Sequence, residues 1–287
     1  MFEIKSNQPV TVFNIPRFDS AHHVEVKAVG EAIREGWTEW SDVVLTAMSG
    51  LGGVGKTETA KSLVHEAIAS REYELVGWFS AASKDQLLAD YRQFVMERRG
   101  WSSEEMKKLS NDEVHHEVNS LLSGFSSFLL VFDNADDHMS IPQWLPYHST
   151  LGTAGAGRRR MVLTSRKDQV WRPMGVTPCI VRIGVPSAAE AMEMLMRRAA
   201  GRSFISSSGA DDDEKGEQKA AAELIEETGR LPLAVSQLGA FLGAHPEVSI
   251  VELLSRWRAG QKELMERNDM SSEDPSVKTV WITLKTM

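Results

Sequence analysis

The chain has 287 residues, enough for one large or two modest domains with an ample core. Its hydrophobic content of 42% and charged content of 25% are typical of a soluble globular protein. The formal net charge of −8 argues against sequence-independent nucleic-acid binding, which depends on many Lys and Arg contacts to phosphate. No apolar run approaches the ~18 residues that a membrane-spanning helix needs, and the single cysteine, Cys179, cannot form a disulfide within the chain. These features predict a cytoplasmic protein with no membrane or nucleic-acid partner.

The N-terminal third places a glycine-rich motif between a strand and a helix. Residues 1–23 show little periodicity, which predicts an extended arm rather than a folded unit. A helix is expected over residues 25–40, followed by a buried strand over the apolar, β-branched run 43–48. The sequence GLGGVGKT then occupies residues 50–57, and a helical pattern follows over residues 58–69. A strand, the pattern G-x-x-x-x-G-K-T and a helix, in this order, form the context in which such a loop binds phosphate.

The chemistry of this loop predicts a nucleotide site that also holds Mg²⁺. Glycines let the backbone curl so that successive N–H groups point at phosphate oxygens, and the helix N-terminus adds partial positive charge. Lys56 would bring a full charge to the β- and γ-phosphates, and Thr57 would offer its hydroxyl to Mg²⁺. The alternative is a glycine-rich turn that binds nothing, but the flanking strand and helix favour the nucleotide site. The residues expected to contact nucleotide here are Gly50, Leu51, Gly52, Gly53, Val54, Gly55, Lys56, Thr57 and Glu58.

A second part of the site is expected where the third strand ends. A strand over residues 74–80 and three helices within residues 84–123 lead to the apolar strand 128–132, which Asp133 follows directly. An aspartate at this position, downstream of a phosphate loop, is expected to hold Mg²⁺ together with the Thr57 hydroxyl. The alternative is an Asp-rich turn after a strand, which is a common arrangement.

A third part of the site is expected at the end of the fourth strand. This strand is predicted over residues 161–164 and is followed by Ser165 and Arg166. An arginine at the tip of a strand in such a sheet can reach the γ-phosphate and stabilise the transferred charge. The alternative is that Arg166 pairs with surface carboxylates. A fifth strand is expected over residues 179–183.

The order of these elements predicts an α/β fold, with a five-stranded parallel sheet covered by helices on both faces. Ligands of such sheets lie outside the carboxyl ends of the strands, where Lys56, Asp133 and Arg166 all fall. The order therefore supports each of the three assignments.

After residue 186 the pattern is helical only, which predicts a small all-helical subdomain over residues 187–267. Within it, residues 201–217 are rich in Ser, Gly and Asp and predict a flexible loop. Residues 268–287 have no core of their own and are expected to be a tail leading to a further domain. The first domain would then comprise residues 1–186.

Four segments, in this order, resemble the motifs of the NB-ARC family of signal-transducing P-loop NTPases. They are residues 50–57, 129–134, 164–166 and 229–234, and their motif sequences are most similar to those of fungal NOD-like receptors. The resemblance implies phosphate binding by residues of the glycine-rich loop, Mg²⁺ coordination by Thr57 and Asp133, γ-phosphate sensing by Arg166 and adenine packing by Pro232. The loop residues that the resemblance assigns to phosphate binding are Gly53, Gly55, Lys56 and Thr57. It also implies that residues 268–287 lead to a winged-helix domain. The resemblance further implies a cytoplasmic signalling protein of innate immunity that could self-associate through the nucleotide-binding domain.

Asn134 departs from the pattern of many family members, which carry a second acid at this position. A carboxylate would help to deprotonate the attacking water, whereas an amide can only orient it, and losing a general base costs about 10²–10⁴ in rate. The expected catalytic residues are therefore Lys56, Asp133, Asn134 and Arg166, with slow ATP hydrolysis unless Asp136 or Asp137 supplies the base. The alternatives are a scaffold that holds ADP without hydrolysis and a phosphotransferase acting on a small acceptor. The sequence does not decide between ATP and GTP.

Overall fold

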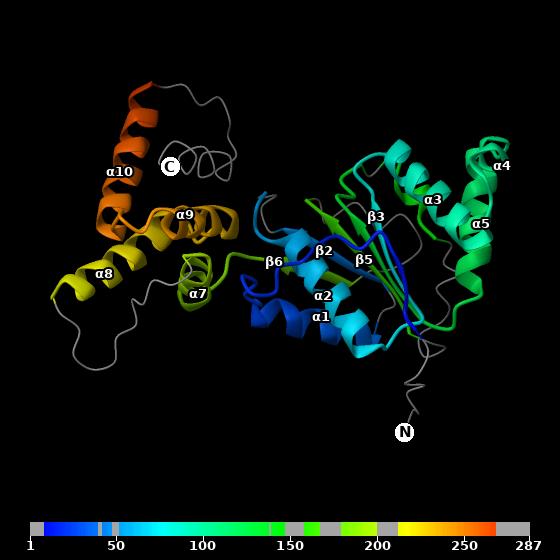
Figure 1. Cartoon of the computed structure of the whole chain (residues 1–287), viewed down its shortest axis with the longest axis horizontal. Coiled ribbons are helices and arrows are strands. Elements are labelled where there is room, and N and C mark those ends of the chain that lie inside the picture. Colours follow the sequence, from blue (N-terminus) through cyan, green and yellow to red (C-terminus); the bar gives the residue numbers. More distant parts are fainter. Residues whose placement is uncertain are drawn as a thin grey trace. The chain divides into compact units, whose positions relative to one another are not determined.

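The computed structural model describes residues 9–39, 42–47, 52–137, 139–146, 158–166, 179–199 and 212–267. The chain divides into two compact units (Figure 1). The first unit comprises residues 1–18, 28–50 and 56–182, and the second comprises residues 19–27, 51–55 and 183–287. Gly50, Leu51 and the expected tail over residues 268–287 lie outside the described residues.

A six-stranded sheet forms the centre of the α/β fold, with the strand order β1-β3-β4-β5-β2-β6. The strands are β1 (Thr11–Phe13), β2 (Asp42–Ala47), β3 (Leu75–Ser80), β4 (Phe128–Asp133), β5 (Arg159–Ser165) and β6 (Cys179–Ile183). The pairs β1–β3, β3–β4, β4–β5 and β5–β2 are all parallel. The expected α/β fold with a parallel sheet is thus confirmed, and all five predicted strands are present.

The sixth strand, β1, corrects two predictions: that the sheet has five strands and that residues 1–23 are only an extended arm. Thr11–Phe13 pairs with Leu75–Gly77 at the edge of the sheet. Phe13 is 2% exposed, and its ring centroid lies 5.1 Å from those of both Phe79 and Phe94. Three residues are too few to show a period-2 pattern in the sequence. The strand is stabilised instead by burial of one aromatic ring in the core.

Helices cover both faces of the sheet. The helices of the first unit are α1 (Lys27–Glu39), α2 (Lys56–Ser70), α3 (Lys84–Arg99), α4 (Ser103–Lys107) and α5 (Asn111–Ser123), with a 3₁₀ turn at Pro142–Trp144. Alternate strand residues such as Phe79, Leu130 and Phe132 form one hydrophobic cluster with the buried sides of α3 and α5. Helix α2, with Ala60 and Val64 fully buried, packs against the central strands, and Figure 1 shows it on the opposite face from α3.

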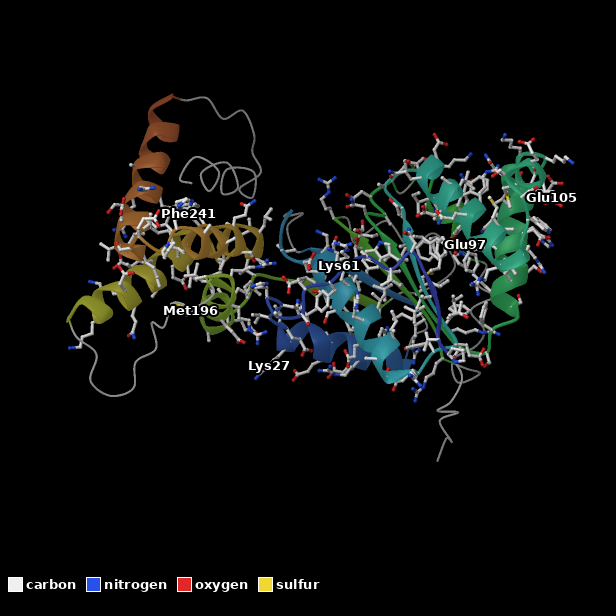
Figure 2. All side chains as sticks on the ribbon, viewed as in Figure 1. Lys27, Lys61, Glu97, Glu105, Met196 and Phe241 are labelled. Atoms are coloured by element: carbon white, nitrogen blue, oxygen red, sulfur yellow. The ribbon has the colours of Figure 1, made fainter. Side chains whose placement is uncertain are left out.

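Capping boxes fix where two of these helices begin. Ser102 accepts a hydrogen bond from the Glu105 N–H, and the Glu105 carboxylate accepts one from the Ser102 N–H (Figure 2 labels Glu105). Ser110 and Glu113 repeat the arrangement at α5. Hydrogen bonds from the serine lower the pKa of both glutamates, so these contacts favour the ionised carboxylates.

His115 on α5 is buried, with 4% exposure, and its imidazole belongs to an aromatic cluster. Its Nε2 lies 2.9 Å from the Leu145 carbonyl oxygen, and its ring lies parallel to that of Tyr91 and edge-on to Trp144. Burial lowers the pKa of His115, and the charge of His116 acts in the same direction, while the Leu145 carbonyl and Asp112 oppose it. The neutral imidazole is therefore the form that the fold accommodates.

Acid should destabilise the protein through His115. Because the pKa of His115 is lower in the folded chain than its ordinary value of about 6.5, the unfolded chain takes up this proton first, and stability falls as the pH drops through that value. We expect the free energy of unfolding, measured by urea denaturation, to fall more from about pH 7 to about pH 5 in the wild type than in His115→Gln. The substitution itself should cost about 1–3 kcal/mol at neutral pH. His116→Gln, on the exposed side of α5, should keep most of the wild-type slope, and an unchanged slope in His115→Gln would contradict the assignment.

The second unit is helical, as expected for the residues that follow the sheet. Its helices are α7 (Ala188–Arg198), α8 (Asp212–Glu227), α9 (Pro232–Ala244) and α10 (Ile250–Arg267). Gly239 and Gly243 let α9 lie against α7, because a Cβ atom at either position would come within 2.7 Å of the Leu195 carbonyl oxygen or 2.9 Å of the Arg198 carbonyl oxygen. Residues 19–27 join this unit through the Lys27 N–H, which donates to Glu190, and the His23 carbonyl, which accepts from Arg197.

The predicted loop over residues 201–217 is wrong for its last part, because α8 begins at Asp212. The Glu217 carboxylate accepts hydrogen bonds from the backbone N–H groups of Ile250 and Val251, at the start of α10. This contact caps one helix with a side chain of another, and acidic composition alone does not reveal it. Among the described helices, none is both long enough and apolar enough to cross a membrane.

Candidate functional site

The described part of the glycine-rich loop has the backbone conformation that the motif predicts. Gly53 and Gly55 have φ angles of +76° and +96°, in the region that glycine enters without steric cost. Between them Val54 is buried, and Lys56 and Thr57 form the first turn of α2. The two glycines precede the N-terminus of a fifteen-residue helix, the kind of helix end whose backbone N–H groups bind phosphate oxygens.

Gly53 also contacts the first turn of α9. The Gly53 carbonyl oxygen accepts a hydrogen bond from the Leu233 N–H at 3.2 Å. A Cβ atom at Gly53 would lie 2.9 Å from the Leu233 Cβ, so only glycine fits here. Pro232 occupies the first position of α9, and Leu231 before it makes no side-chain cap. The Gly53 carbonyl therefore partly caps α9, and Pro232 directly precedes Leu233 in the sequence.

Thr57 and Asp133 are joined directly. The Thr57 hydroxyl donates to the Asp133 carboxylate at 2.9 Å, although the two residues are 76 positions apart in the sequence. The same carboxylate oxygen accepts a hydrogen bond from the Thr164 hydroxyl at 2.5 Å. Thr164 is buried on β5, beside Asp133 on β4, and its oxygen accepts the Asn134 N–H at 2.8 Å. Thr164 thus orients the carboxylate that the sequence assigns to Mg²⁺.

The donors at this point fit magnesium. A hydroxyl and a carboxylate are hard oxygen ligands, and Mg²⁺ usually takes one or two protein ligands of this kind and completes its shell with water and phosphate. The hydrogen bond between Thr57 and Asp133 shows that their oxygens face a common point. Within the described ranges there is no cluster of three or more His, Cys, Asp or Glu side chains that could hold a metal without a ligand's help.

Asn134 adopts a left-handed backbone conformation with φ of +67° and is exposed. Asparagine is among the few non-glycine residues that enter this region readily. The two nearby carboxylates are engaged in other contacts. Asp136 binds Arg166, and Asp137 accepts hydrogen bonds from the N–H groups of Met139 and Ser140 and from the Ser140 hydroxyl.

Arg166 makes an ion pair with Asp136, which is the alternative considered from the sequence. The Arg166 Nε donates to one carboxylate oxygen of Asp136 at 2.6 Å, and the Arg166 backbone N–H donates to the other at 2.7 Å. The Arg166 side chain is 61% exposed and that of Asp136 is 22% exposed. Half-burial alone would raise the pKa of Asp136, but the hydrogen bonds from Arg166 outweigh it and the pKa is lowered. The role of Arg166 at a γ-phosphate remains a prediction.

Lys56 is half-buried among these charges. Burial lowers the pKa of its ammonium group, and the Arg166 guanidinium acts in the same direction, whereas Asp136 and Asp133 raise it. The structure therefore brings Lys56, Asp133 and Arg166 to one edge of the sheet, as the strand order predicts. Burial disfavours this cation, and a bound polyphosphate would stabilise it.

Glu58, also expected at the nucleotide, is exposed on α2 and pairs with Lys61 at 2.6 Å (Figure 2 labels Lys61). Sequence reasoning missed the contributions of Thr164 and Asp136. Thr164 is the polar residue that interrupts a buried strand one position before Ser165, and this is the signal that could have identified it. Asp136 lies in an Asp-rich segment whose composition is that of a turn.

Comparisons with known proteins identify the family of the chain and support its fold. The NB-ARC domain family model matches residues 26–203, more than half of the chain. A Walker-type ATPase of Pyrococcus abyssi is similar in structure, with a TM-score of 0.51 and 13% identity over 95% of this chain and 92% of that chain. The ADP form of the ORC2 protein of Aeropyrum pernix has a TM-score of 0.48 and 14% identity over 93% of this chain and 70% of its own. At such identities the likeness of the first shows the fold alone. None of the curated proteins matches the sequence.

Proposed function

Because the chain belongs to the NB-ARC family, we propose that this P-loop module binds ADP and ATP with Mg²⁺ and hydrolyses ATP slowly. In this proposal it acts as a molecular switch in a signalling protein of the NOD-like receptor type. The hydrogen bond between Thr57 and Asp133 is the single observation that carries the proposal. It joins the start of the phosphate-binding helix to the end of β4, the arrangement that phosphate-loop NTPases use to hold nucleotide-bound magnesium.

The residues at the sheet edge have distinct tasks in the proposed reaction, in which water attacks the γ-phosphorus in line with the leaving β-phosphate. The backbone N–H groups of the loop and of the first turn of α2 bind the phosphates, and Lys56 balances charge on the β- and γ-oxygens. Thr57 and Asp133 would hold Mg²⁺, which neutralises charge developing on the same oxygens. Arg166 adds a second cation on the γ side.

Slow turnover is part of the proposal because of Asn134. Its amide can orient water but cannot accept the proton, and Asp136 and Asp137 are both engaged in other hydrogen bonds. The alternative function, a scaffold that holds ADP without hydrolysis and assembles under regulation, is favoured by the same residue. The two differ in whether any phosphate is released.

The contact between Gly53 and Leu233 supports the switch. Because the loop carbonyl receives the Leu233 N–H, a change in the loop on exchange of ADP for ATP would alter the start of α9. Pro232 would pack against the base. Self-association and a role in innate immunity are further parts of this proposal that depend on the family alone.

Asn134→Asp tests the assignment of slow hydrolysis. A carboxylate at this exposed, left-handed position restores a base, and aspartate tolerates the same backbone conformation. We expect phosphate release from Mg-ATP to rise about tenfold or more above that of the wild type. Asn111→Asp, on α5, keeps its acceptor for Arg92 and should leave the rate unchanged.

The outcome separates the two functions. Phosphate release by the wild type that is above background, and higher in Asn134→Asp, supports the slow switch. Tightly bound ADP carried through purification, with no release by either protein, selects the non-hydrolysing scaffold.

A further inference from the structure

Both carboxylate oxygens of Asp136 accept hydrogen bonds from Ser165 and Arg166, at the carboxyl end of β5. One oxygen accepts the Arg166 backbone N–H at 2.7 Å and the Ser165 hydroxyl at 3.2 Å. The other oxygen accepts the Arg166 Nε–H at 2.6 Å. Asp136 lies 30 residues before Arg166 in the chain, so this contact ties the segment after β4 to the carboxyl end of β5.

The geometry points to Asp136 as the positioning residue of Arg166: we propose that its carboxylate directs the guanidinium so that the arginine can engage the γ-phosphate of a nucleoside triphosphate. This inference rests on the proposed nucleotide function and adds a residue to it. The Asp136 contact to the arginine side chain uses Nε, and the guanidinium of the 61% exposed side chain carries further N–H donors on its two terminal nitrogens. An arginine can therefore keep Nε on a carboxylate and present its outer edge to an anion.

The half-burial of Asp136 helps it to restrict the motion of the Arg166 side chain. A long, exposed arginine side chain samples many rotamers, and fixing it costs side-chain entropy each time a ligand binds. A carboxylate that is only 22% exposed, and that is itself fixed by the backbone N–H of the same arginine, confines that motion before the ligand arrives.

Asp136→Asn separates the positioning role from a structural one. The asparagine Oδ1 can still accept the Arg166 backbone N–H and the Ser165 hydroxyl, while the amide NH₂ faces the Arg166 Nε–H with a donor instead of an acceptor. We expect the full chain to keep wild-type affinity for ADP in titration calorimetry. Its affinity for the β,γ-imido analogue of ATP should fall about tenfold or more.

Two further variants complete the test. Arg166→Ala should show the same selective loss, and the double variant should lose no more than either single one, because both substitutions remove one interaction. Asp90→Asn is the matched control: this half-buried carboxylate accepts the Ser80 N–H at 2.7 Å, at the carboxyl end of β3. It should leave the ratio of the two affinities unchanged.

Each result is decisive. Equal losses for ADP and the analogue in Asp136→Asn, or additive losses in the double variant, would overturn the positioning role while nucleotide binding stands. A selective loss in Arg166→Ala without one in Asp136→Asn would overturn it as well. A wild-type chain that binds neither nucleotide would remove the proposed function itself, and the inference with it.

Discussion

Lys56→Ala is expected to weaken nucleotide binding strongly. The substitution removes the full positive charge at the start of α2 from the β- and γ-phosphates, and a hydrogen bond to a charged group is worth about 1.5–3 kcal/mol. The affinity for Mg-ATP should therefore fall by about 10–100-fold in titration calorimetry, and the thermal shift on adding nucleotide should shrink with it. Phosphate release should fall to background.

The nucleotide-free variant should be at least as stable as the wild type. The lowered pKa of Lys56 shows that its surroundings disfavour the cation, chiefly through burial and also through Arg166. Removing the charge removes that cost. Lys61→Ala, one turn further along α2, is the control, because Lys61 pairs with Glu58 on the same helix and should not affect binding. Equal phosphate release by the wild type and Lys56→Ala would refute hydrolysis at this site.

Asp133→Asn is expected to uncouple nucleotide binding from magnesium. The asparagine can still accept the hydroxyl hydrogen bonds of Thr57 and Thr164, so the strand ends keep their geometry, but the anionic ligand is lost. Metal stabilisation of charge on phosphate is worth several kcal/mol, so phosphate release from Mg-ATP should fall about a hundredfold or more. ADP affinity without magnesium should change little.

The measurement is a pair of titrations, with magnesium and with a chelator, for the wild type and the variant. The wild type should bind ATP more tightly when magnesium is present, and Asp133→Asn should show no such gain. Asp85→Asn, in the first turn of α3 and exposed, should behave as the wild type. A variant that keeps the full magnesium dependence would show that Asp133 is not the ligand.

The sequence predicts best where chemistry and periodicity agree within a short segment. The strand ending in Asp133 is continuously apolar, and the glycine-rich loop stands between a strand and a helix, so both were predicted together with their positions at one edge of the sheet. The fold follows from this alternation, because strands joined through helices form parallel sheets. The prediction is confirmed for the fold.

Contacts between distant segments are what the sequence does not reveal. The pair Asp136 and Arg166 joins two strand ends, and the choice between phosphate and carboxylate as partner of the arginine depends on the conformation of both loops. His115 shows the same limit: a helical pattern gives its face, while its burial depends on Leu145 and Trp144, some 30 residues later. In each case the partner is set by tertiary packing.

The glycines of α9 have a mechanical consequence. Because Gly239 and Gly243 present only hydrogen atoms to the carbonyl groups of α7, the two helices contact each other through their backbones. If Leu233 moves α9, we expect α7 to move with it, because no flexible side chain separates the two backbones at these glycines. The movement would also reach Glu190 and Arg197, which bind the Lys27 N–H and the His23 carbonyl. We therefore expect the helical unit to move as one rigid body.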